Sequence, residues 1–206
     1  MSIITRANLT ELLSSRRLVI DPILDEAKQI GELSIDLRLG IDFLITSYTR
    51  NPYIDIDFDG KRIDNHFKKT RRQIGDQIVL YPHQTVLAST LEYIKLPSDV
   101  FCELKTRSSY NRLGLSVSTI IQPGYTGCFS LELTNNNLSA IKLTTGSRIV
   151  QAIFHRVDTE LDYLHSVRKY LCQVRPVVSR ADKDEELKKL KSMRLGRKNS
   201  YKNEEE

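Results

Sequence analysis

The chain has 206 residues and a mass of 23.7 kDa, enough for one complete hydrophobic core or for one domain with a tail. Hydrophobic residues make up 40% and charged residues 28% of it, which excludes wholesale disorder, and no apolar run approaches the roughly 18 residues of a membrane-spanning helix. The formal net charge is +5, but residues 183–206 supply two of these charges, so residues 1–182 are close to balance and lack the basic stripe of a nucleic-acid-binding face. A site for a small anion fits this distribution better, and nucleic acid is not an expected partner.

The N-terminal part of the chain is predicted to begin with a helix and to continue as strands. Residues 5–16 have a helical pattern, because Thr5 can cap the helix and three leucines fall on one face. Pro22 then favours extended backbone in the residue before it. Apolar and polar residues alternate over 33–39, which predicts a strand with Leu33 and the three alternate residues after it on one side.

The middle of the chain is predicted to be built from short strands. Residues 48–78 are polar and irregular, so we expect a loop or a hairpin insertion there. After it, strand patterns recur with turn signals and without helical segments between them, which indicates an antiparallel sandwich or barrel and not a βαβ sheet. The predicted strands cover residues 77–82, 85–94, 100–106, 114–121, 128–135, 140–143 and 148–157.

The C-terminal residues 183–206 are charged and nearly free of apolar side chains. This composition predicts a short amphipathic helix that passes into a flexible tail, so the domain itself is expected to span residues 1–182. The three cysteines are scattered and odd in number, and the N-terminus has no basic region followed by an apolar stretch. We therefore expect a cytoplasmic protein with reduced thiols and no membrane association.

Residues 105–137 contain three features that need an explanation. The first is the run Thr106-Arg107-Ser108-Ser109 with Arg112 behind it. Hydroxyl groups, two guanidinium groups and free backbone N–H groups after a strand are typical of a phosphate-binding site. The alternative is a helix N-cap at Ser108, and the residues alone leave both readings open.

The second feature is Glu132, which strand alternation places on one face with Ser130 and opposite Leu131. This carboxylate either faces solvent or lines a pocket, where it would be suited to moving protons. The third feature is the link from Gln122 to Tyr125, which contains Pro and Gly. It is either a plain β-turn or a turn whose backbone holds a sugar with Tyr125 packed against it.

Metal chemistry is not predicted from the sequence. The zinc deaminase signature requires H-x-E and P-C-x-x-C, but no histidine here is followed by Glu two residues later and no two cysteines are neighbours. We therefore expect no catalytic metal.

Taken together, these segments resemble the dCTP deaminase branch of the dUTPase-like superfamily, over nearly the whole chain to about residue 184. The resemblance is carried in order by RRLVIDP followed by LSIDLRLG, VLASTLEYIKLPSDV, TRSSYNRLGL, QPGYTGCFSLELTN, GSRIVQAIF and KYLCQVRPVVSRADKD. It implies a mainly β fold, a distorted β-barrel or jelly-roll of the dUTPase-like type with a short N-terminal helix and a C-terminal lid segment. It also implies a homotrimer with active sites between subunits.

The activity implied by the resemblance is hydrolytic deamination of dCTP to dUTP and ammonia without a catalytic metal, with Mg²⁺ accompanying the triphosphate. Feedback inhibition by dTTP is common in the family. Two alternatives stay open: a bifunctional dCTP deaminase and dUTP pyrophosphatase that gives dUMP, and a catalytically weak, nucleotide-binding regulatory trimer.

The resemblance also assigns roles to individual residues. Glu132 matches the catalytic glutamate, Ser108 the water-polarising serine, and Arg112 the arginine near the base and phosphates. Arg107, Ser108 and Ser109 match the phosphate-binding run. The backbone of Ser130 and Leu131 matches the part that recognises the cytosine edge.

Further substrate contacts are implied for the turn and for the C-terminal segment. Gln122 and Tyr125 lie where the family binds the sugar. Lys169 and Gln173 match tail residues that close over the nucleotide, and Tyr163 matches a tail tyrosine with a one-residue shift in spacing.

Two departures from the family pattern bear on the reaction. The segment between Gly114 and Pro123 is shorter than the usual family loop by two or three residues and lacks its additional arginine. Gln122 stands where the family usually has an acid, and its amide can bind a 3′-hydroxyl but cannot act as a base. Deamination is therefore favoured over dUTP hydrolysis, while altered selectivity or loss of catalysis stays open.

Overall fold

A computed structural model of the chain describes residues 2–47, 53–54, 63–160, 170, 172–187, 189–190 and 193. The chain forms two compact units: the first comprises Met1–Thr46 and Lys68–Val177, and the second comprises Ser47–Phe67 and Val178–Glu206. The described part of the second unit includes the short 3-10 helix Ala181–Lys183. The sequence boundary expected at residue 182 stays a prediction.

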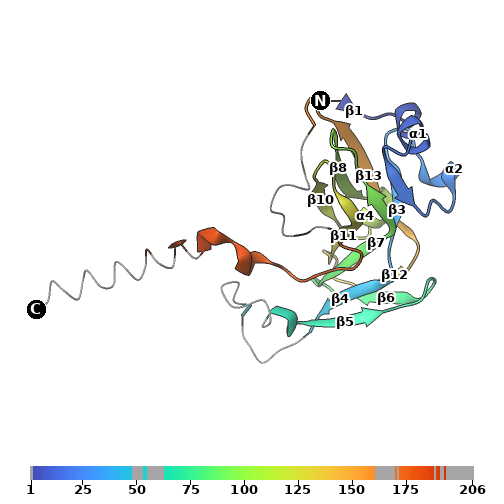
Figure 1. The fold of residues 1–206 in the computed structure, drawn as a ribbon. Coiled ribbons are helices and arrows are strands. Elements are labelled where there is room, and N and C mark those ends of the chain that lie inside the picture. Colours follow the sequence, from blue (N-terminus) through green and yellow to red (C-terminus); the bar gives the residue numbers. More distant parts are fainter. Residues whose placement is uncertain are drawn as a thin grey trace, which may run out of the picture. The chain divides into compact units, whose positions relative to one another are not determined.

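The first unit is built mainly from strands, as the sequence predicts (Figure 1). No helix within the described ranges is long and apolar enough to cross a membrane. In chain order the elements are β1 (Ser2–Ile3), α1 (Arg6–Ser14), β2 (Val19–Asp21), α2 (Glu26–Gln29), β3 (Ile35–Arg38), β4 (Asp42–Thr46), β5 (Phe67–Arg71), β6 (Gln77–Leu80), β7 (Thr85–Lys95), β8 (Val100–Thr106), α4 (Ser108–Asn111), β9 (Leu115–Ser116), β10 (Ser118–Ile121), β11 (Thr126–Asn135), β12 (Ile141–Thr144) and β13 (Arg148–Arg156).

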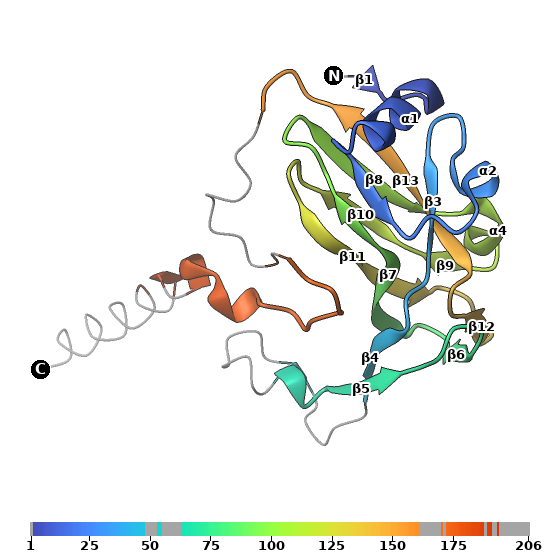
Figure 2. The same cartoon turned by 45° about the vertical axis from the view of Figure 1, so that its right-hand side comes forward.

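The strands form two larger sheets and one small one. The five-stranded sheet has the order β1-β13-β8-β10, with β3 also on β13, and the six-stranded sheet has the order β5-β4-β7-β11-β9, with β2 also on β7. Strands β12 and β6 form the third sheet. The long pairs β7–β11 and β8–β13 are antiparallel (Figure 2). The predicted mainly β fold class is confirmed, but the sheets of the described residues have open edges and do not close into a barrel.

Apolar side chains from all these elements meet in one core. Helix α1 contributes Leu9, and strands β8, β11 and β13 contribute Leu104, Phe129 and Phe154, all fully buried. The predicted helix is confirmed, although the Thr5 side chain at its N-cap makes no capping hydrogen bond. Burial of such side chains, each contributing about 1.5–3 kcal/mol, holds the two larger sheets together.

One sequence prediction needs correction in this part of the fold, and the predicted loop or hairpin insertion contains a strand. Leu33 lies before β3 and is exposed, so it does not share the face of Ile35 and Leu37, which are fully buried. Within the polar segment 48–78, of which only part is described, residues 67–71 form strand β5. The Lys and Arg side chains of β5 are exposed at the edge of the six-stranded sheet, where charge discourages pairing with another chain.

A polar network crosses this apolar core where β7 departs from regular pairing. Between the pairs Cys128↔Tyr93 and Ser130↔Ser89, one residue of β11 opposes three residues of β7, which include Glu92. The Glu92 side chain is fully buried and accepts hydrogen bonds from the backbone N–H of Arg38 at 2.9 and 3.1 Å and from Gln29 Nε2 at 3.2 Å. Burial raises the pKa of Glu92 from 4.5 to about 7.

Candidate active site

The first part of the candidate site is the short helix α4, which follows β8 and lies beside β9 (Figure 2). The structure places Arg107 at the N-cap position, with no side-chain capping bond, and Ser108 as the first helical residue. The alternative that Ser108 caps the helix is therefore wrong. Ser108, Ser109 and Arg112 are exposed, and the first turn of a helix offers backbone N–H groups to an anion.

Arg107 is held by a buried carboxylate on β3. Its Nε lies 3.0 Å from Asp36 Oδ2, and Nη1 of Arg148 lies 3.3 Å from the same oxygen. Arg107 Nη1 also donates to the backbone carbonyl of Arg148 at 3.0 Å. Burial raises the pKa of Asp36, and the two guanidinium groups oppose that rise. One carboxylate thus faces two guanidinium groups, which leaves a net positive charge beside α4.

The second part is Glu132, whose side chain points outward from β11 between the buried residues Leu131 and Leu133. The outward orientation agrees with the alternation in the sequence. Thr119 on β10 donates from Oγ1 to Glu132 Oε2 at 2.7 Å. This hydrogen bond joins the two larger sheets, because β10 belongs to the five-stranded sheet and β11 to the six-stranded one.

The backbone positions expected at the base-recognition edge lie in the same strand. Ser130 is half-buried and Leu131 is fully buried, so Leu131 offers only its backbone to a ligand. Gln122 is exposed, and its carbonyl accepts from the Tyr125 N–H at 3.3 Å, which closes the predicted turn. Tyr125 itself is buried, packs against Phe129 and donates its hydroxyl to the Cys128 carbonyl at 2.8 Å.

The third part is the segment at residues 172–177, which ends the first unit and lies next to β11. The Gln173 carbonyl accepts from the Cys128 N–H at 2.7 Å, and the Gln173 side chain is 8% exposed. Neither its Oε1 nor its Nε2 has a hydrogen-bond partner within the described residues. A buried amide of this kind is costly unless a further group satisfies it.

Gly127 makes this close approach of the two backbones feasible. A Cβ at Gly127 would lie 2.5 Å from the Gln173 carbonyl oxygen and 2.9 Å from its nitrogen, and the φ of Gly127 is +139°. Both the contact and the backbone conformation therefore require glycine at this position.

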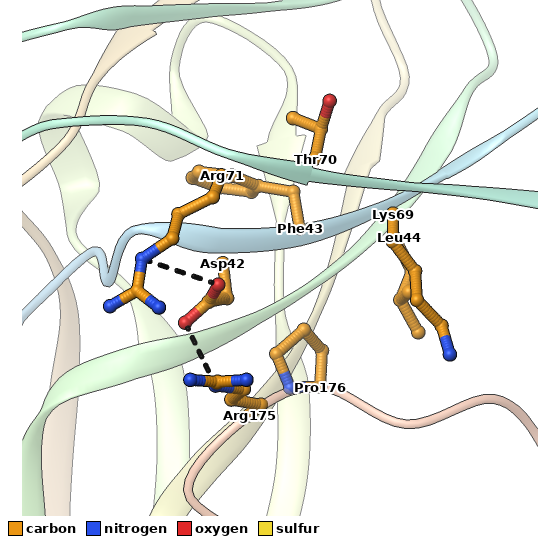
Figure 3. Close-up of a pocket in the computed structure, with 8 residues that line it drawn as sticks. All are labelled: Asp42, Phe43, Leu44, Lys69, Thr70, Arg71, Arg175 and Pro176. Carbon is orange, nitrogen blue, oxygen red and sulfur yellow. Dashed lines mark ion pairs between the residues drawn. The ribbon is translucent and has the colours of Figure 1, made fainter.

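An ion pair anchors the same segment further along (Figure 3). Asp42 on β4 lies 3.6 Å from Arg175 Nε, and it also lies 3.8 Å from Arg71 Nε on β5. Pro176 is buried beside them and lines, with Phe43 and others, a pocket of about 290 Å³. The segment that carries Gln173 is thus held against β11 at Gln173 and against β4 at Arg175.

The three parts of the candidate site are not joined by a direct bond between their predicted catalytic side chains. Within the described residues, no hydrogen bond or ion pair joins Glu132 to Arg107, Ser108 or Arg112. Tyr163 and Lys169 lie outside the described residues, so their predicted roles stay predictions.

Sequence reasoning missed Asp36, Thr119 and Gly127. The available signal for Gly127 was its position directly before the predicted strand 128–135. The turn alone does not require a glycine there. Asp36 gave a weak signal as a carboxylate among apolar residues of β3, whereas nothing in the sequence placed Thr119 opposite Glu132.

Comparison with known proteins gives one consistent result. A family model described as dCTP deaminase-like matches residues 3–157. A relative from Methanobrevibacter smithii named "dCTP deaminase, dUMP-forming" is 35% identical over 196 residues, which cover 92% of this chain and 100% of the relative. A relative from Halorubrum lacusprofundi named "dCTP deaminase" is 32% identical over 190 residues, covering 89% of this chain and 93% of the relative.

A solved structure shows the same fold. The crystal structure of 2′-deoxycytidine 5′-triphosphate deaminase from Agrobacterium tumefaciens matches with a TM-score of 0.58 and 23% identity. The match covers 75% of this chain and 48% of that protein, so this chain spans about half its length.

Proposed function

This chain belongs to the dCTP deaminase-like family, and we propose that it catalyses the hydrolytic deamination of dCTP to dUTP and ammonia. The observation that carries the proposal is Glu132, an outward carboxylate on β11 with one oxygen held by Thr119. It lies in the segment whose resemblance to the family's catalytic motif is described above. Curated relatives named dCTP deaminase support the same reaction.

The reaction needs a group that moves protons at the pyrimidine ring. Water adds to C4 of cytosine, and Glu132 takes one proton from that water and delivers it to the ring nitrogen N3. Glu132 then takes the remaining proton from the new C4 hydroxyl and delivers it to the 4-amino group as the C4=O bond forms. The C4–N4 bond then breaks and ammonia leaves. A positioned acid/base of this kind contributes about 10²–10⁴ in rate. Ser108 orients the water, and Arg112 balances negative charge near the base.

The triphosphate binds at α4 in this proposal. Exposed Ser108 and Ser109 offer hydroxyl and backbone N–H donors, and Arg107 with Arg148 exceeds the charge of Asp36 by one. The substrate is the Mg²⁺ complex of dCTP, in which the ion arrives with the phosphates. A cationic surface suits that complex, because the phosphates carry more negative charge than the ion neutralises.

The complete site requires a homotrimer in this proposal, with residues of neighbouring subunits meeting at each nucleotide. This assembly is consistent with the absence of a direct hydrogen bond between Glu132 and Ser108 in the single chain. Gln173, Lys169 and Tyr163 then close over the nucleotide, and the unsatisfied Gln173 amide supplies a donor and an acceptor for its polar groups. The same site would take dTTP as an inhibitor.

A second candidate reaction continues from dUTP to dUMP. The name of the Methanobrevibacter smithii relative supports it. Gln122 argues against it, because an amide cannot activate the water that hydrolyses the phosphate.

One assay separates these possibilities. The protein is incubated with dCTP and Mg²⁺, and dUTP, dUMP and ammonia are resolved over time. We expect dUTP and ammonia in equal amounts, whereas dUMP as the product would support the second candidate. Binding of dCTP without turnover would overturn the proposal that the protein is an enzyme and would indicate a regulatory trimer.

The role of Glu132 has its own test. Glu132→Gln should lower kcat more than about tenfold while dCTP binding, measured by calorimetry, is retained, because the amide keeps the shape and loses the proton transfer. Glu11→Gln, an exposed carboxylate on α1, is the control and should change neither value. More than about a tenth of the wild-type turnover in Glu132→Gln would refute general acid/base work by this residue.

A further inference from the structure

We infer that Thr119 is a positioning residue that holds the carboxylate of Glu132 in its reactive orientation. The inference rests on the proposed function, and it adds a residue from outside the motif segments that carry the resemblance to the family. Its basis is the 2.7 Å hydrogen bond from Thr119 Oγ1 to Glu132 Oε2. This distance is at the optimum for an O–H···O hydrogen bond, and an ionised acceptor makes such a bond stronger than a neutral pair.

The backbone that carries Thr119 is fixed from both sides. Val117 donates its N–H to Thr106 Oγ1 at 2.7 Å, which anchors the start of β10 to the end of β8. The next four residues of β10 pair in register with β8, with Thr119 opposite Leu104. Threonine is also restricted at χ1 because it is β-branched. The hydroxyl therefore occupies a defined position above β11.

The backbone of Glu132, whose side chain accepts the hydrogen bond from Thr119, is also held in place. Glu132 lies in the longest strand pair of the molecule, opposite Leu87 on β7, and its neighbours Leu131 and Leu133 are fully buried. Only the side chain of Glu132 is free to change rotamer. Because the carboxyl group is exposed, the bond from Thr119 is the contact within the described residues that restricts it.

The hydrogen bond from Thr119 gives the two carboxylate oxygens of Glu132 different roles. Oε2 is occupied by the hydroxyl, whereas Oε1 has no partner within the described residues and is presented to the attacking water. Strands β9 and β10 are separated by Val117 alone, and Thr119 is the second residue of β10. Within this short segment its hydroxyl reaches the carboxylate of Glu132.

The kinetic test compares two substitutions. Thr119→Val keeps the shape and removes the hydroxyl, so we expect kcat for dCTP deamination to fall about 10- to 100-fold with KM within about twofold, given the usual strength of a hydrogen bond to a charged group. Thr119→Ser keeps the donor and should retain kcat within about threefold. Full activity of Thr119→Val, a loss in KM alone, or equal losses in both variants would overturn the inference.

A second measurement does not depend on activity. The melting temperatures of Thr119→Val, Glu132→Ala and the double variant form a double-mutant cycle. We expect the double variant to melt higher than the sum of the two single shifts predicts, since both single variants break the same bond. Additive shifts in melting temperature would show that Thr119 and Glu132 are not coupled and would overturn the inference. An inactive wild type with a coupled cycle would overturn the proposed function and leave the Thr119–Glu132 bond in place.

Discussion

Substitution of Glu92 by Gln should remove a pH-dependent loss of stability. The Glu92 carboxylate is fully buried between β7 and β3, and its oxygens accept from the Arg38 N–H and from Gln29 Nε2. Burial raises its pKa from 4.5 to about 7, because desolvation of the anion outweighs the hydrogen bonds and the nearby Arg38 charge. Gln has the same shape and keeps an acceptor for the Arg38 N–H, but it does not titrate.

The sign and the size of this change in stability follow from the protonation of Glu92 in the folded and the unfolded chain. Between pH 4.5 and 7 the unfolded chain releases the Glu92 proton while the folded chain keeps it, so the free energy of unfolding falls as the pH rises. Above pH 7 both states are ionised and the loss is complete, at about 3 kcal/mol for the shift in pKa. In a chain of this size that loss corresponds to roughly 6–12 °C in melting temperature.

The assay is thermal unfolding of the wild type and Glu92→Gln between pH 5 and 8.5 at one protein concentration. We expect similar melting temperatures at pH 5 and a more stable Glu92→Gln variant at pH 8.5. Asp36 also titrates with a raised pKa, so the difference between the two proteins isolates Glu92. Glu11→Gln, on the surface, should follow the wild type. The reasoning fails if Glu92→Gln and the wild type keep a constant separation across the whole pH range.

One further substitution and two truncations address the C-terminal part of the chain. Gly127→Ala should raise KM for dCTP several-fold and increase proteolysis of residues 172–177, because its Cβ would collide with the Gln173 backbone. The control is Gly75→Ala, where φ is +93° and the space around the residue is open. This control should change neither KM nor proteolysis. Truncation after Asp162 should leave a folded protein that binds and converts dCTP poorly, as measured by circular dichroism and steady-state kinetics. Truncation after Asp182 should leave the kinetics unchanged, and a loss of activity there would assign a role to the charged tail.

The sequence predicted those features that depend on local pattern. Strand β11 and the outward position of Glu132 follow from a period of two, and α1 follows from the spacing of its leucines. Strand β5 was not predicted, since its Lys and Arg side chains lack apolar alternation. An edge strand needs fewer buried residues, so its pattern is weaker than that of a central strand.

The contacts that organise the candidate site depend on pairs far apart in the sequence. Asp36 meets Arg107 and Arg148 across more than 70 residues, and Thr119 meets Glu132 through two different sheets. The sequence around each partner does not show which residue it meets, because a contact between two strands or between a strand and a helix end leaves no mark in either local pattern. The buried position of Tyr125 was likewise hidden, since a tyrosine in a turn is compatible with solvent exposure as well as with core packing.

The position of β13 has a consequence for synthesis of the chain on the ribosome. Strands β1 and β3 pair with residues 148–156, so these two strands receive their sheet partner only after almost the whole first unit has been translated. At roughly 5–20 residues per second they wait about 6–30 s. During that time Ile35 and Leu37, which are fully buried in the finished protein, lack the pairing strand β13. Nascent chains that stop before Arg148 therefore expose an apolar strand edge, and ribosome stalling in this region would produce aggregation-prone fragments.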